Sequence, residues 1–333
     1  MKITLKDIAE ETGYSISTVS RVLNGSDKIS AETRRAILHS AKKMNYPGLY
    51  SRDGGLLDTV HVTLVVTDYH IGEFYASFFK GMNAAAQEYD ICLSMINIEK
   101  PVSRLIQRLR QICSKGNSDG VILFSPELTK TDYQTIREEL PHEFPMLSNG
   151  LIECPILTTI SFDSYSGGYM TAEHFLERGY DRCGIIRGPF RSAEARYRSN
   201  GFRDYILQHP EISITWTYDG DFSYESGVRA FDDYFTTAPR PRAIFACNDA
   251  MGHGFLTRAL AEGYRVPEDV AVVGYDDLPI CRHHRPAISS VHTNYKQLGI
   301  VTMDNLRERL ASNGNEDGVL SLVPVKLIVR ESS

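Results

Sequence analysis

The chain has 333 residues, which is long enough for two or three domains of ordinary size. Apolar residues make up 42% of it and charged residues 23%, as in globular proteins, and no apolar run approaches the roughly 20 residues of a membrane-spanning helix. The first ten residues hold no signal-peptide core, so we expect a cytoplasmic protein without a membrane partner. Six scattered cysteines without a CxxC pair predict reduced thiols.

Charge is distributed unevenly along the chain. Residues 1–52 carry a net charge of +4, whereas the whole chain carries −6, so residues 53–333 carry −10. A small basic segment before an acidic body indicates that only the first segment meets a polyanion such as DNA. Charge alone does not separate this interpretation from local variation in composition.

Three short helices are predicted in residues 1–46. Thr4, Ser15 and Ser30 are suited to helix N-caps, and Gly13 and Gly25 to helix ends. Apolar residues recur at i, i+3 and i+4 within the segments ITLKDIAEETG, ISTVSRVLN and AETRRAILHSAKKM. A helix, a tight turn with glycine and a second helix predict the helix-turn-helix geometry.

The second predicted helix offers a face for DNA. With its valines and leucine packed inward, Ile16, Ser17, Ser20 and Arg21 point outward, and the helix N-terminus would enter the major groove. An arginine such as Arg21 can donate two hydrogen bonds to guanine. A small helical bundle with a polar surface is the alternative. Short polar residues expected to contact phosphate oxygens are Thr4, Ser15, Thr18, Ser20, Asn24, Ser30 and Thr33.

From residue 60 onward, strand-like and helical patterns alternate. This alternation predicts parallel βαβ units, and about 270 residues exceed one ordinary core, so two α/β lobes are expected. Polar and aromatic residues follow several predicted strands, where parallel sheets bind ligands. Carboxylates, amides and aromatic rings together suit a polyhydroxylated ligand, although any one of them could be a turn former. These strand ends are Asp68–Tyr69, Ser125–Pro126, Asn149, Phe162–Asp163, Asn248–Asp249 and Tyr275–Asp276.

The segment TLKDIAEETGYSISTVSRVLNG resembles the DNA-binding head of the lac/gal repressor family of bacterial transcription regulators. The resemblance implies that Ile16, Ser17 and Arg21 read bases and that Tyr46 contacts the DNA backbone. It also implies a two-lobed core like a periplasmic sugar-binding protein, with three crossings between lobes. The expected limits are 1–46 for the head, 47–59 for the hinge and 60–333 for the core, with an N-lobe at about 60–159 and 292–320 and a C-lobe at about 162–287 and 323–333.

The same resemblance points to effector-binding residues. Arg198 lies in ARYRSNGF, Asn248 in CNDAMGHG and Asp276 in VVGYDD, each matching a family motif. An NPFF-like run usual after the first core strand lacks its asparagine and proline here, so contacts from the N-lobe are expected to differ. The full expected set is Tyr69, Glu73, Ser125, Asn149, Phe162, Arg198, Phe222, Asn248, Asp276 and Tyr295.

The segment NYPGLYSRDGGLLDTV occupies the place of the family's hinge helix, which folds on operator DNA and wedges a leucine between base pairs. Arg52 fits the family pattern PNxxARxL, but Gly54 replaces the leucine. Since two glycines weaken a helix by about 2 kcal/mol, we expect a weak hinge helix, with a nearby leucine such as Leu56 as the wedge and with reduced DNA bending.

Catalysis is not expected. Walker, HExxH, GxSxG and GxGxxG motifs are absent, and the CRHH run at 281–284 is too compact to close a metal site alone, so neither metal nor cofactor is predicted. The resemblance implies a repressor of a sugar-utilisation operon. Its partners would be double-stranded operator DNA, a small sugar (a galactoside is favoured) and a second copy in a homodimer, because the chain stops directly after its last strand without a tetramer-forming helix. The alternatives are a corepressor-dependent regulator with a purine or a phosphoprotein partner, and a sugar-binding module whose head pairs with protein.

Overall fold

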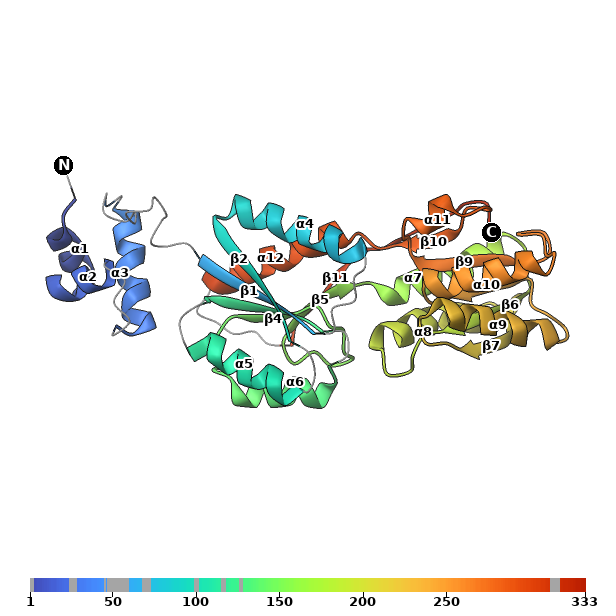
Figure 1. Cartoon of the computed structure of the whole chain (residues 1–333), viewed down its shortest axis with the longest axis horizontal. Helices are drawn as coiled ribbons and strands as arrows, with labels where there is room; N and C mark the ends of the chain where they lie inside the picture. Colours follow the sequence, from blue (N-terminus) through green and yellow to red (C-terminus); the bar gives the residue numbers. More distant parts are fainter. Residues whose placement is uncertain are drawn as a thin grey trace.

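The computed structural model of the chain describes residues 3–23, 29–44, 46, 60–67, 73–98, 102–114, 118–125, 128–311 and 318–333. Figure 1 shows a small helical head at the N-terminal end, followed by two α/β lobes. Several expected site residues lie outside the described residues: Asn24, Tyr69, the side chain of Glu73, and the hinge residues Arg52, Gly54 and Leu56.

The head consists of helices α1 (Leu5–Thr12), α2 (Ile16–Leu23) and α3 (Ala31–Lys43). Ile8, Val19, Val22 and Ile37 are buried together between them, so the predicted apolar faces form one small core. Gly13 ends α1 in the left-handed region, with φ 75°, and its N–H donates to the carbonyl of Ala9 at 2.9 Å. The helix-turn-helix prediction is therefore confirmed.

The first lobe, called the N-lobe, is built on a six-stranded sheet. The face that carries alternate residues of β1 packs against helices α4 and α12, and the opposite face packs against α5 and α6. In sheet order the strands are β11 (Leu320–Val323), β5 (Thr158–Phe162), β4 (Met146–Ser148), β3 (Gly120–Phe124), β1 (Val60–Val66) and β2 (Ile91–Asn97). The helices are α4 (Glu73–Glu88), α5 (Val102–Ser114), α6 (Lys130–Glu139) and α12 (Tyr295–Ala311).

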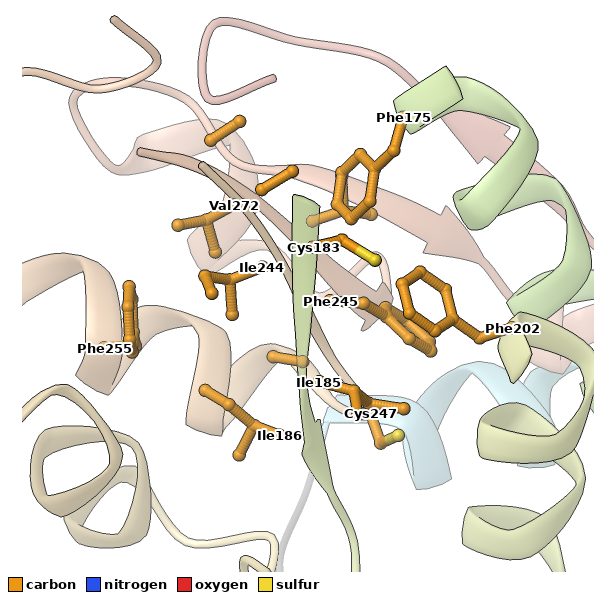
Figure 2. Packing of buried hydrophobic residues seen from close by; sticks show 14 of the residues in the cluster. Phe175, Cys183, Ile185, Ile186, Phe202, Ile244, Phe245, Cys247, Phe255 and Val272 are labelled. Carbon is orange, nitrogen blue, oxygen red and sulfur yellow. The ribbon is translucent and has the colours of Figure 1, made fainter. Parts of the chain in front are cut away.

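The second lobe, called the C-lobe, repeats this layered plan. Figure 2 shows Phe175 and Phe202 against Cys183 and Phe245 on one side of the sheet, with Phe255 on the other side. The strands are β12 (Lys326–Ile328), β10 (Ser289–His292), β9 (Ala271–Asp276), β8 (Ala243–Ala246), β6 (Arg182–Arg187) and β7 (Ser213–Asp219). The helices are α7 (Ser164–Glu177), α8 (Ala193–Gln208), α9 (Tyr224–Thr236), α10 (Asp249–Ala261) and the short α11 (Ile280–His283).

The chain passes between the lobes three times, from β5 to α7, from β10 to α12 and from β11 to β12. Both sheets are parallel except where β12 pairs antiparallel with β10. The three segments end a few residues beyond the expected lobe limits. Strands β5, β10 and β11 continue to Phe162, His292 and Val323 before the chain crosses to the other lobe. Among the described residues, no helix is long and apolar enough to cross a membrane.

A close contact between α7 and α8 fixes the position of α8 beside the crossings. An ideal Cβ on Gly168 of α7 would lie only 1.9 Å from the carbonyl oxygen of Arg198 on α8. Only glycine allows the two backbones to approach this closely. The consequence is that the side chains of α8, Arg198 among them, are held at a defined depth in the C-lobe.

Candidate functional site

The face of α2 predicted to meet DNA is exposed. Ile16 is 49% exposed at the first position of the helix, and Ser17 and Arg21 are also exposed. Ser17 and Arg21 are four residues apart and therefore share one face of α2. Val19 and Val22 of the same helix are buried. The arrangement presents an apolar side chain that can contact a thymine methyl and a guanidinium that can donate to guanine.

Several residues expected to contact phosphate also cap helices. The hydroxyl of Ser15 accepts from the backbone N–H of Thr18 at 3.1 Å, and that of Ser30 accepts from Thr33 at 3.2 Å. Thr4 donates to the Asp7 carboxylate at 2.7 Å. Since a hydroxyl has further lone pairs, capping does not prevent phosphate contact. Ser20 is half-buried on α2, and Tyr46 is half-buried against the head core. Their phosphate roles stay predictions.

In the C-lobe, Arg198 is the centre of the candidate effector site. The residue is 4% exposed, and its guanidinium lies 3.8 Å from the ring centroid of Tyr275. Its Nη1 donates to the carbonyl of Cys247 at 2.7 Å, and its Nη2 donates to the Asp276 carboxylate at 3.1 Å. Burial lowers the pKa of the Arg198 guanidinium, but the neighbouring groups together, Asp276 first among them, outweigh burial and raise the pKa.

Two residues beside Arg198 have backbone conformations that side chains rarely adopt. Asp276 has φ 105° and Phe222 has φ 70°. Such conformations are strained in residues other than glycine and tend to occur at functional sites. The centroid of the Phe222 ring lies 6.0 Å from the Arg198 guanidinium. The backbone carbonyl of Phe222 accepts a hydrogen bond from Asn248 Nδ2 at 2.9 Å. Asn248 also caps α10, its Oδ1 accepting from Met251 N–H at 3.0 Å, so it holds the Phe222 backbone in place.

Two carboxylates of the site share one electrostatic environment. Burial raises the pKa of Asp276 to about 6, against the opposing effect of Arg198. Burial, and then the charge of Asp276, raise the pKa of Asp249 to about 7. Asp249 is fully buried and accepts hydrogen bonds from the Ser290 hydroxyl at 2.6 Å and from Leu278 N–H at 2.7 Å. Raised pKa values of buried carboxylates are common at functional sites. Here they make the charge of the site depend on pH.

The N-lobe residues of the expected set make internal contacts. Asn149 Nδ2 donates to the carbonyl of Ile160 at 3.0 Å and to Thr302 Oγ1 at 2.9 Å, while its Oδ1 is buried without a partner among the described residues. The hydroxyls of Ser125 and Thr67 bond to each other, and both residues are buried. Neither side chain is open to a ligand in this arrangement, and the effector-binding roles of Asn149 and Ser125 stay predictions.

Aromatic residues stand at the crossings between lobes. Phe162, at the end of β5, packs edge-on against Tyr295, at the start of α12, with ring centroids 5.0 Å apart. Phe162 also borders a cavity of about 50 Å³ that includes Tyr197 of α8 and Leu322 of β11 among its lining residues. This volume suits a water molecule and not a sugar, so the described residues around Phe162 form no preformed sugar-sized cavity.

A wider groove of about 580 Å³ lies elsewhere, along the exposed face of α5. Its lining includes Asn97, Arg104 and Arg108, and it contains none of the expected effector residues. The described part of its walls lacks carboxylates and aromatic rings, which are the groups that bind sugars. We therefore place the candidate effector site at Arg198 and not in this groove, although the groove is larger.

One ion pair joins the two lobes near the site. Arg196 on α8 donates through Nε to the Glu153 carboxylate at 2.8 Å, and Glu153 precedes β5 in the N-lobe. The Arg196 guanidinium also lies 5.6 Å from the ring of Phe190, which is 84% exposed. The pair is partly solvent-exposed, so it stabilises this arrangement of the lobes only modestly.

Three further residues complete the site. Tyr275 lies under the guanidinium, Thr293 donates to the carbonyl of Asp276 at 3.0 Å, and Glu194 lies one helical turn before Arg198. The i, i+4 spacing of Glu194 and Arg198 on a predicted helix is visible in the sequence. The other contacts join residues far apart in the chain, which spacing alone does not reveal.

The CRHH run and the six cysteines lie among the residues that the structure describes. No group of three or more His, Cys, Asp or Glu side chains there is arranged to hold a metal ion. All six cysteines are free, and Cys281 of the CRHH run is buried.

Comparison with known proteins gives separate matches for the head and for the core. A family model described as bacterial regulatory proteins, lacI family, matches residues 4–47, and one described as periplasmic binding protein-like domain matches residues 172–333. The chain is 27% identical to the HTH-type transcriptional repressor PurR of Photobacterium profundum, over 99% of this chain and 98% of the relative.

Among solved structures, the chain is similar to a complex of the transcriptional regulator CelR with cellobiose, with a TM-score of 0.71 and 29% identity over all of both chains. It also shares its fold with the lac repressor dimer bound to operator and the anti-inducer ONPF. That match has a TM-score of 0.74 and 23% identity over 100% of this chain and 99% of the other.

Proposed function

The chain belongs to the lacI family of bacterial regulatory proteins, and on this premise we propose that it is a repressor whose operator affinity is changed by a small sugar bound beside Arg198 and Asp276. It is a DNA-binding transcriptional regulator with a separate ligand-binding domain, and it is not an enzyme. We also propose the domain limits expected from the sequence, with the head at 1–46, the hinge at 47–59 and the core at 60–333.

The observation that carries the sugar proposal is the cluster around Arg198. A buried guanidinium, the Asp276 carboxylate and the Phe222 ring meet at the carboxyl ends of C-lobe strands. Carboxylates take hydroxyl pairs and aromatic rings cover the apolar face of a sugar. Similarity at 29% identity to a regulator solved with cellobiose supports a glycoside. Galactosides, favoured from the sequence, remain part of the same proposal.

The coupling proposal rests on where the site lies. The chain crosses between the lobes next to Phe162, Thr293 and Tyr295, so a ligand held by Arg198 and Asp276 sits beside the crossings. A ligand changes the arrangement of lobes only if it binds one arrangement better, and a factor of ~100 corresponds to roughly 2.7 kcal/mol. In a dimer, a changed arrangement of lobes alters the spacing of the two heads on a near-palindromic operator.

A second candidate is a corepressor-dependent regulator with a purine ligand. It is favoured by the relatives named PurR, which match 98–99% of each chain at 25–27% identity. In that case the ligand tightens DNA binding, so the sign of the effect separates the two candidates. A phosphoprotein corepressor would give the same sign but would not need the Arg198 site. A sugar-binding module whose head pairs with protein would bind DNA weakly and without sequence preference.

Fluorescence anisotropy on the chain's own promoter DNA tests these candidates. The full-length protein is titrated at about 150 mM salt, without ligand and then with cellobiose, galactosides, pentoses, guanine and hypoxanthine. The sugar proposal predicts specific binding that one of the sugars weakens at least tenfold. Tighter binding with a purine would establish the second candidate, and the absence of specific binding would contradict both.

A further inference from the structure

The charges around Arg198 do not balance. Asp276 Oδ1 lies 3.1 Å and Glu194 Oε2 lies 3.9 Å from the same Nη2 atom of the guanidinium. One positive group therefore faces two negative ones. The Glu194 side chain is 32% exposed and the Asp276 side chain 15% exposed, so both carboxylates are nearer to solvent than the Arg198 side chain, which is 5% exposed.

Both terminal nitrogens of Arg198 already have a protein acceptor. Nη1 donates to the carbonyl of Cys247, Nη2 donates to Asp276, and one face of the guanidinium lies on the Tyr275 ring. The Nε atom is buried without a partner among the described residues. Recognition of phosphate or carboxylate by arginine uses two neighbouring N–H groups. In Arg198 the contacts with Cys247 and Asp276 leave fewer N–H groups for an anion.

Other basic residues of the neighbourhood do not restore a positive charge. Arg187 is paired with Asp219, with Nε and Oδ1 2.7 Å apart, and Arg196 is paired with Glu153. Arg191 is exposed, and among the described residues no ion pair joins it to Glu194 or Asp276. By sequence, residues 68–72 and 126–127, which follow β1 and β3, contain neither lysine nor arginine.

We propose that Glu194 restricts this site to uncharged polyhydroxylated ligands and excludes phosphorylated sugars and sugar acids. The carboxylate of Glu194 accepts a hydrogen bond from a ligand hydroxyl. The negative charge of Glu194 repels an anion that approaches Arg198. This inference deepens the proposed function, because it assigns a ligand class to the same site. Glu194 also lies in the first turn of α8, where an acidic side chain stabilises the helix. A purely structural role would therefore affect stability without affecting ligand selectivity.

The test compares the full-length protein with Glu194→Gln and with Glu211→Gln, a matched loss of one charge at an exposed position beyond α8. Isothermal titration uses glucose with glucose 6-phosphate and trehalose with trehalose 6-phosphate. Inorganic phosphate at constant ionic strength, read from the shift in Tm, serves as a probe that needs no knowledge of the effector.

We expect the wild type and Glu211→Gln to prefer the uncharged member of any pair that binds. Glu194→Gln should bind phosphate and the phosphorylated sugars at least about tenfold more tightly than the wild type, which corresponds to roughly 1.4 kcal/mol. Preference of the wild type for a phosphorylated sugar, or equal phosphate affinity in all three proteins, would overturn the proposal. Failure of the proposed function would be seen separately, as operator binding that no sugar changes while the charge selectivity persists.

Discussion

The Arg198 guanidinium and the Asp276 carboxylate lie 3.1 Å apart, although 78 positions separate them in the chain. Arg198 comes from α8 and Asp276 from the end of β9, so the pair joins two layers of the C-lobe. Both side chains are largely removed from water, and the backbone of Asp276 is strained at φ 105°. A buried pair held by a strained backbone indicates selection for a site and not for stability alone.

Removing one partner of this pair should be costly. Asp276→Asn leaves the buried Arg198 charge with only the more distant and more exposed Glu194 carboxylate, so we expect the free energy of unfolding to fall by about 3 kcal/mol. Urea unfolding measures it. Asp221→Asn, which removes an exposed pair with Arg229, is the control and should cost less than about 1 kcal/mol. Equal effects of the two substitutions would show that the Arg198–Asp276 pair is effectively solvated.

The head makes a separate prediction about base reading. Arg21→Ala should weaken binding to a selected operator by about 1–3 kcal/mol and relax the preference for one base pair. Thr33→Ala, which removes one of the predicted phosphate contacts, should weaken binding to all sequences alike. Anisotropy on operator and on scrambled DNA measures both. A uniform loss with Arg21→Ala would mean that Arg21 contacts phosphate and not a base.

The ion pair between Glu153 and Arg196 predicts that these two side chains affect ligand affinity together. Because the contact between Glu153 and Arg196 joins the two lobes in this arrangement, removing either side chain should shift the population away from it. Glu153→Gln, Arg196→Gln and the double variant should therefore change ligand affinity by the same amount. The expected interaction energy in the double-mutant cycle is about 0.2–1 kcal/mol, since both side chains are partly exposed. Additive effects would show that the two side chains act independently.

Ligand affinity should fall as the pH is lowered. Burial raises the pKa of Asp276 to about 6, so below that pH the side chain is increasingly protonated. A protonated Asp276 loses its ion pair with Arg198 and part of its capacity to accept ligand hydroxyls. We expect the Kd of the effector to rise as the pH is lowered through the pKa of Asp276. Isothermal titration at several pH values measures it.

Glu194 provides the control for this pH dependence. Its charge contributes to the raised pKa of Asp276, so Glu194→Gln should lower that pKa and move the midpoint of the affinity profile to lower pH. A midpoint that does not move, or an affinity that increases as the pH falls, would assign the pH dependence to another group.

Much of the fold could be predicted from local patterns. The alternation of strands and helices expected from residue 60 onward is present, and β1 and β2 are continuous runs of mostly apolar or β-branched residues, which is a strong strand signal. Strands β11 and β12 have only four and three residues, too few for a period to show.

The sequence motifs predicted which residues form the site but not which contacts these residues make. Motifs named Arg198, Asn248 and Asp276, and the structure brings all three to one end of the C-lobe sheet. Spacing could not show that Asn149 donates to Thr302, which lies 153 positions away in the chain. Such contacts depend on tertiary packing. The roles assigned to Asn149 and Phe162 in binding an effector stay predictions.

The central claim, that a ligand beside Arg198 controls operator affinity, is tested most directly by operator-binding isotherms of the wild type and Arg198→Lys, each with and without effector. Lysine keeps the charge but cannot reproduce the planar fork that contacts Cys247 and Asp276. We predict that both proteins bind operator equally without effector and that only the wild type changes its affinity, at least tenfold, when effector is added. An equal response of the two proteins to effector would contradict the account.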